Sequence, residues 1–151
     1  MATVNSSAAA LRIAGDTLDP DAIALALGHQ ATSSQSKGQS IVGGHPRTVR
    51  IAKTGHWRLA AKDRSPANLD AQIDEILSCL SSDLSVWAGL RAVYKIDLFC
   101  GLFMDANEGL TILPSSLTAL GSRGIELDLD IYGAGKQAEP WPRSASDRLG
   151  R

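Results

Sequence analysis

The chain has 151 residues, of which 44% are hydrophobic and 21% charged, and its 15 basic and 16 acidic residues leave a net charge of −1. These values are typical of one globular domain and exclude a disordered chain. The near-neutral charge also argues against a general nucleic-acid or membrane-surface binder.

The first residues carry neither a basic segment nor an apolar run of signal-peptide length, and no stretch approaches the roughly 20 apolar residues of a membrane-spanning helix. We therefore expect a cytoplasmic protein. The two cysteines, Cys79 and Cys100, fall in a predicted helix and a predicted strand among apolar neighbours. Buried free thiols are the expected state in a reducing compartment, and a disulfide between them is the alternative.

The predicted elements begin with a strand over residues 9–14, preceded by an N-terminus, residues 1–8, that we expect to be flexible. A short helix follows. Asp19 can accept hydrogen bonds from the free amides of its first turn, and Pro20 suits the first helical position because it lacks an N–H. Gly28 is placed to end this helix.

Residues 29–46 contain four serines, three glycines and few large apolar side chains. This composition predicts a long loop, which is functional or mobile when it occurs in a compact domain. Strands are predicted over residues 47–53 and 57–60, with a turn at residues 54–56.

An apolar stripe over residues 69–80 predicts a long helix that begins at Pro66 or Asn68, and Asp83 is placed to cap a further short helix. Residues 93–104 alternate as a strand, with Lys95 on the face opposite the apolar side chains.

Residues 114–120 predict a short helix, and residues 125–132 predict a half-buried strand. The inward positions of this strand are Ile125, Leu127, Leu129 and Ile131, and the outward ones are Glu126, Asp128, Asp130 and Tyr132. Residues 133–151 carry glycine, proline, serine and scattered charge, which predicts a flexible tail.

The resulting order, β-α-β-β-α-(α)-β-α-β, predicts an α+β fold in a single domain over residues 9–132. We expect a single, largely antiparallel sheet of about four to six strands, with helices packed on one face, in a ferredoxin-like plan.

The sequence contains no catalytic or metal-binding signature. The three histidines, His29, His45 and His56, lie in or beside predicted turns and loops without the spacing of metal ligands. No nucleophile elbow and no phosphate-binding loop is present either. We therefore expect neither an enzyme nor a bound metal or cofactor.

The first candidate surface is basic and aromatic. Arg50, Trp57 and Arg58, with His56 and Lys37, could bind an anion or a base through charge and stacking. In the structural alternative, the outer face of a strand pair carries the charges and Trp57 packs into the core.

The second candidate surface is an acidic stripe that consists of Glu126, Asp128, Asp130 and, from a neighbouring strand, Asp97. Carboxylates two residues apart share one face of a strand at a spacing of about 6–7 Å. This stripe could face a basic partner or a divalent ion. In the structural alternative, the carboxylates pair across strands with Lys95 or Arg50.

Several stretches of the chain together carry a family resemblance: residues 11–28, Lys37-Gly38, residues 54–59, residues 93–100, Gly109-Leu110 leading to Pro114, and residues 127–132. In this order they resemble the bacterial domain-of-unknown-function family 4279 (DUF4279), over about residues 9–132. The family has no settled activity, so the resemblance implies the fold rather than the function.

Two functional hypotheses follow. The first is a non-enzymatic domain that binds another protein through the acidic stripe, in an immunity or antitoxin-like role against the basic surface of a toxin. The second is a small-molecule sensor for an anionic ligand, with residues 29–46 as a lid over the basic and aromatic surface. We expect neither a nucleic-acid nor a membrane partner, and the oligomeric state is left open.

Overall fold

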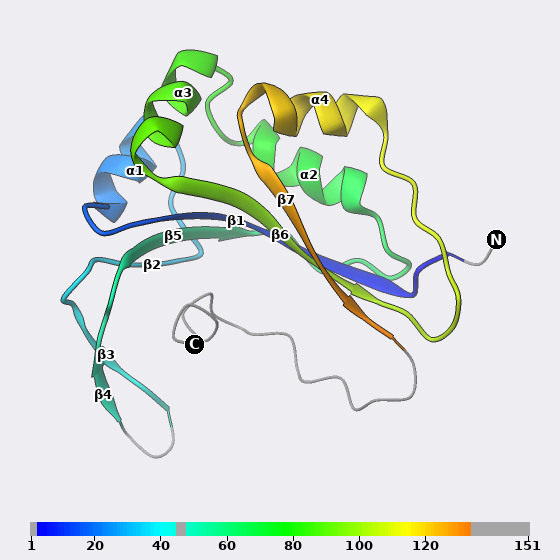
Figure 1. Cartoon of the computed structure of the whole chain (residues 1–151), viewed down its shortest axis with the longest axis horizontal. Coiled ribbons are helices and arrows are strands. Elements are labelled where there is room, and N and C mark those ends of the chain that lie inside the picture. Colours follow the sequence, from blue (N-terminus) through cyan, green and yellow to red (C-terminus); the bar gives the residue numbers. More distant parts are fainter. Residues whose placement is uncertain (1–2, 45–47, 134–151) are drawn as a thin grey trace.

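In the computed structural model, which describes residues 3–44 and 48–133, helices cover one face of a five-stranded sheet (Figure 1). The sheet strands are β1 (Ser6–Gly15), β2 (Ser33–Gln35), β5 (Gly55–Ala60), β6 (Lys95–Phe103) and β7 (Glu126–Tyr132). The helices are α1 (Pro20–Leu27), α2 (Leu69–Ser78), α3 (Leu84–Val93) and α4 (Pro114–Ser122). A separate hairpin consists of β3 (Ser40–Val42) and β4 (Val49–Ile51). The predicted α+β fold class is confirmed.

The sheet has the order β2-β5-β1-β6-β7. The central strand, β1, pairs antiparallel with both β5 and β6, and β2 pairs antiparallel with β5. Only the last pair among the described strands of this sheet, β6 with β7, is parallel. Parallel neighbours need a crossover connection, and the segment that carries α4 provides it. The sheet is therefore largely antiparallel, as predicted.

Local side chains set the starts of three helices. Asp19, Asn68 and Asp83 each accept a hydrogen bond from an amide in the first turn of α1, α2 and α3, at 3.1, 3.0 and 2.9 Å respectively. At the other end of α1, Gly28 has a φ of 81°, a left-handed conformation that favours glycine. These helix ends are as the sequence predicts.

The hydrophobic core lies between the helices and the sheet. Leu11 and Ile13 of β1, Trp57 of β5 and Leu98 of β6 are all 0% exposed. In β1 and β5 they alternate with polar or small residues, and in β6 Leu98 stands between Asp97 and Phe99, so the opposite face of the sheet carries a different set of side chains.

A buried polar contact joins α2 to the central strand. The Gln72 side-chain amide donates to the backbone carbonyls of Ser7 at 3.0 Å and Lys62 at 2.8 Å, and its carbonyl accepts from the Ser7 hydroxyl at 2.7 Å. Because the side chain of Gln72 is fully buried, these bonds replace those that it would make with water and fix α2 against β1.

Several boundaries differ from the predictions. The first strand begins at Ser6 rather than at residue 9, and Val4 is 1% exposed, so residues 4–8 belong to the fold and are not a flexible N-terminus. The predicted loop over residues 29–46 contains β2 and β3, and β5 begins within the predicted turn at residues 54–56. β2 (Ser-Ser-Gln) and β3 (Ser-Ile-Val) have only three residues each, too few to show the alternation that marks a half-buried strand.

Residues 45–46, the last two of the predicted loop, lie outside the described residues. Nearly all of the predicted flexible tail also lies outside them. So does His45.

Both cysteines are free thiols. Cys100 is 0% exposed on the core side of β6, and burial raises the pKa of its thiol to about 12. Cys79 is exposed, which corrects the prediction of two buried thiols. It follows the last turn of α2 and lies off the stripe that packs on the sheet. No helix in the described ranges has the length and apolar character needed to cross a membrane.

Candidate functional site

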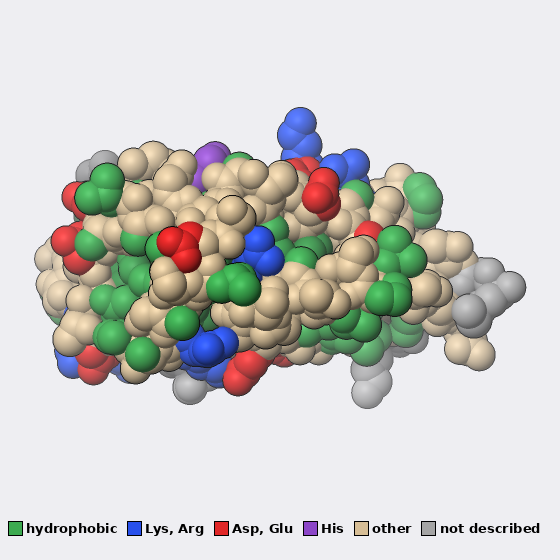
Figure 2. Space-filling model, turned by 90° about the horizontal axis from the view of Figure 1, so that it is seen from above, with side chains coloured by type: hydrophobic (Ala, Val, Ile, Leu, Met, Phe, Trp, Pro, Cys, Tyr) green, Lys and Arg blue, Asp and Glu red, His purple; other side chains and the backbone are tan. Residues whose placement is uncertain are grey.

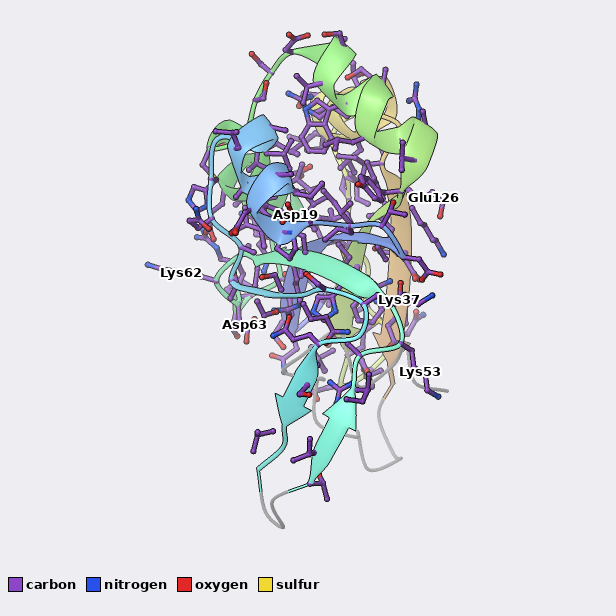
Figure 3. All side chains as sticks on the ribbon, turned by 90° about the vertical axis from the view of Figure 1, so that its left-hand side faces the viewer. Asp19, Lys37, Lys53, Lys62, Asp63 and Glu126 are labelled. Atoms are coloured by element: carbon purple, nitrogen blue, oxygen red, sulfur yellow. The ribbon has the colours of Figure 1, made fainter. Side chains whose placement is uncertain are left out.

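The face of the sheet opposite the helices carries most of the polar side chains that the sequence singles out. We call it the polar face and define it by Arg12, Ser33, Gln35, His56, Arg58, Asp97, Glu126 and Asp128. The β3–β4 hairpin projects on this side, with Lys37 and Lys53 near its base (Figure 3). The helix side, by contrast, shows charges of both signs scattered among polar and hydrophobic side chains (Figure 2).

A partly buried ion pair lies at the centre of the polar face. The Nε of Arg12 donates to Asp97 Oδ1 at 2.8 Å and its Nη2 to Asp97 Oδ2 at 2.6 Å, a bidentate arrangement. The same Nη2 lies 3.4 Å from Asp128 Oδ2, and the guanidinium lies 4.2 Å from the centre of the Phe99 ring. Asp97 is only 4% exposed, so this member of the predicted acidic stripe is engaged inside the protein.

The structural alternative, in which the carboxylates of the stripe pair across strands, named Lys95 or Arg50 as the basic partners. The partner is Arg12, which lies directly opposite Asp97 in the β1–β6 register. Arg12 is the one charged residue in the apolar strand predicted over residues 9–14, which indicates that it needs a partner. The sequence does not show which strand lies beside it, so the partner could not be identified.

The other three carboxylates of the acidic stripe lie along β7 at the edge of the sheet. Glu126 is exposed, and the Asp128 side chain is 52% exposed. Asp130 is half-buried and accepts a hydrogen bond from the Tyr132 hydroxyl at 2.8 Å. The accessible acidic groups of the stripe are therefore Glu126 and Asp128.

The opposite side of β7 is less buried than predicted. Ile125, just before the strand, is 6% exposed, but Leu129 is 41% and Ile131 56% exposed. The second half of β7 runs past the helix layer (Figure 1), in agreement with the exposure of these two side chains. The prediction that all four apolar residues point into the core is thus wrong for Leu129 and Ile131.

The sheet divides the predicted basic and aromatic surface. Trp57 packs into the core, as the structural alternative holds, whereas its neighbours His56 and Arg58 lie on the polar face. Lys37 pairs with Asp16 at 3.0 Å in an exposed ion pair. Of the five residues proposed for this surface, His56 and Arg58 lie together in the structure. The charge of Arg50 is close enough to lower the pKa of His56.

Two buried polar atoms at this end of the polar face, the Ser33 hydroxyl oxygen and the Nδ1 atom of His56, have no hydrogen-bonding partner among the described residues. The neighbouring Arg58 forms no ion pair with the described carboxylates. His56 and Arg58 are 4% and 7% exposed. Burial, together with the charges of Arg50 and Arg58, lowers the pKa of His56, and burial beside Arg12 lowers the pKa of Arg58.

A groove of about 840 Å³ lies between α2 and α4. Asp70 of α2 crosses one end of it, and its Oδ1 accepts hydrogen bonds from the Leu113 amide at 3.0 Å and the Ser116 hydroxyl at 2.6 Å. The lining mixes apolar and polar side chains. In the part of the chain that the structure describes, no three histidine, cysteine or carboxylate side chains gather where they could hold a metal ion.

Comparison with known proteins gives one match. The family model for a domain of unknown function, DUF4279, matches residues 3–134, which is most of the chain. No curated protein and no solved structure gives a significant match. The family match confirms the resemblance seen in the sequence, and the chain belongs to the DUF4279 family.

Proposed function

We propose that this chain is a non-enzymatic domain that binds a basic protein partner along β7, in an immunity-type role in which it covers the basic surface of a toxin. One observation carries the proposal. An edge strand presents the carboxylates of Glu126 and Asp128 on one face and the exposed side chains of Leu129 and Ile131 on the other.

An edge strand of this kind suits the addition of an extended segment from a partner. Within the described residues β7 pairs only with β6 and forms an edge of the sheet, and an edge strand can accept a further strand. In such complexes the main-chain hydrogen bonds give affinity and alternate side chains give specificity. The added strand would place basic residues against Glu126 and Asp128 and apolar residues against Leu129 and Ile131.

The two carboxylates also favour rapid association. The net charge of the whole chain is only −1, so attraction of a basic partner depends on the local field at β7. Exposed charges interact over a Debye length of about 8 Å at physiological ionic strength. The association rate should therefore fall as salt is added.

The test begins with purification of the tagged protein from its native host and identification of a stoichiometric partner by mass spectrometry. The purified partner is then compared by surface plasmon resonance with wild type, Glu126→Gln/Asp128→Asn and a control, Asp21→Asn/Asp74→Asn. The control removes two exposed carboxylates from the helix layer. We expect several-fold slower association for the β7 variant at low salt and little change for the control. Equal behaviour of the two variants would contradict the proposal.

A further inference from the structure

Two arginines face each other on the polar face, and only one has a counter-charge. Arg12 and Arg58 are directly opposite in the β1–β5 register, and like charges in that position repel. Asp97 neutralises Arg12 through the bidentate pair. The charge of Asp63 also acts on Arg58, but the two form no ion pair. Arg58 is therefore a buried cation without a bound carboxylate among the described residues, an arrangement that costs free energy.

Two further groups without partners lie beside this arginine. Ser33 of β2 is directly opposite Arg58, and His56 precedes Arg58 by two positions on β5, so all three side chains lie on the same face. Neither the Ser33 Oγ nor the His56 Nδ1 has a hydrogen-bond partner, although both atoms are buried. Nearly all buried polar atoms in proteins are hydrogen-bonded. Two such exceptions beside a buried cation point to a ligand that accepts hydrogen bonds and carries negative charge.

We propose that Ser33, His56 and Arg58 bind a small oxyanion, a phosphate or carboxylate group. The guanidinium offers a planar pair of N–H donors that matches either group. The serine hydroxyl donates a third bond, and the histidine donates from Nδ1 in the tautomer that carries its proton there. Arg50 and Arg12 add positive potential around the site. Because Arg58 is only 7% exposed, the site suits a small anionic group rather than a bulky ligand.

This site is separate from the proposed protein-binding strand. It lies on β2 and β5 at one edge of the sheet, whereas β7 forms the other edge. Failure of the protein-binding proposal therefore does not contradict the oxyanion site, and the reverse also holds.

The test is thermal unfolding of the full chain at constant ionic strength, in chloride alone and with phosphate, acetate or citrate replacing part of the chloride. Wild type is compared with Arg58→Met, which removes the charge at similar volume, and with Lys62→Met, which removes an exposed positive charge just after β5. We expect an oxyanion to raise the melting temperature of wild type and Lys62→Met by several degrees, and not that of Arg58→Met. A rise with phosphate alone assigns a phosphate group, and a rise with the carboxylates alone assigns a carboxylate.

Two results would overturn the proposal. One is a wild-type melting temperature that no oxyanion raises beyond chloride. The other is an Arg58→Met protein that melts well below wild type in chloride alone, because removal of an uncompensated charge should leave stability equal or higher. A Ser33→Ala variant keeps the charges of Arg12 and Arg58 and removes only the hydroxyl donor. Calorimetric titration of this variant with the anion that stabilises wild type should show several-fold weaker binding. Unchanged affinity would contradict the role given to Ser33.

Discussion

At the scale of single residues, His56 makes the stability of the fold depend on pH. Its imidazole is 4% exposed, and burial and two neighbouring arginines hold its pKa below the ordinary value of 6.5. The unfolded chain therefore binds a proton at His56 more readily than the folded chain does. The stability that comes from the neutral imidazole is complete above about pH 6.5 and is lost as the pH falls towards the folded-state pKa.

We expect wild type to lose more stability than His56→Gln between about pH 7.5 and about pH 5.5, as measured by urea denaturation at each pH. Carboxylates contribute to the loss in both proteins, so the difference between them isolates His56. An identical loss would assign the acid sensitivity to the carboxylates alone.

The Arg12–Asp97 pair should behave as a buried unit. Asp97→Leu leaves Arg12 beside Arg58 without its bidentate partner, and loss of one member of a buried pair costs about 3–5 kcal/mol. Arg12→Leu/Asp97→Leu removes both charges and should recover most of that loss. Denaturation of the two single variants and the double variant measures the coupling. Additive losses would show that the two side chains act independently.

At the scale of elements, Asp70 supplies the cap that α4 lacks. No side chain of α4's own N-cap position accepts a hydrogen bond, and Asp70 of α2 instead accepts from the Leu113 amide and the Ser116 hydroxyl. We expect Asp70→Ala to lower the free energy of unfolding by about 1 kcal/mol, the typical worth of a capping side chain. Asp74→Ala, one turn later and exposed, is the matched control and should change it by less than about 0.5 kcal/mol. Similar losses in the two variants would argue against the cap.

Gln72 fixes α2 against β1, so loss of its side-chain amide should lower the stability of the fold. Gln72→Met keeps the volume but leaves the Ser7 and Lys62 carbonyls without this donor. The cost of unsatisfied buried groups is about 1–3 kcal/mol. Calorimetric unfolding of the variant should show a correspondingly lower melting temperature, whereas an unchanged one would mean that water replaces the amide.

The elements differ in how far the sequence alone determines them. Asp19, Asn68 and Asp83 cap helices through bonds within a few residues, so the helix starts were predictable from local sequence. The polar strand β2 forms because it pairs with β5, a segment further along the chain, and no local pattern marks it. β3 pairs with the nearby β4, but its three residues are too few to show an alternation.

The same distinction applies to the candidate site. Alternation correctly placed Lys95 and Asp97 on the face opposite the core, because that property is local to the strand. The register between strands decides which of these residues meet. Arg12 and Asp97 are 85 positions apart in the chain, so their contact could not be predicted from spacing.

At the scale of the whole molecule, stability is distributed unevenly over the two sheets. β1 has partners on both sides and a buried face, whereas the β3–β4 hairpin exposes Val42, Val49 and Ile51 at 61%, 68% and 58%. A two-stranded hairpin with so little burial is marginally stable on its own. In native-state hydrogen exchange followed by NMR, we expect the slowest amides in β1 and β6 and the fastest ladder amides in β3 and β4. Comparable protection in the hairpin would show that it is held by contacts beyond its own pairing.

The central position of β1 also has a consequence for protein synthesis. This strand is translated before both of its neighbours, and β6 is complete only when the ribosome has added Phe103. Until then an apolar, alanine-rich strand has at most one edge covered, so the nascent chain exposes a segment that invites aggregation or chaperone capture. Commitment of the sheet to its final arrangement therefore waits until β6 has been synthesised, and termination before β6 releases a chain whose central strand lacks one of its two partners.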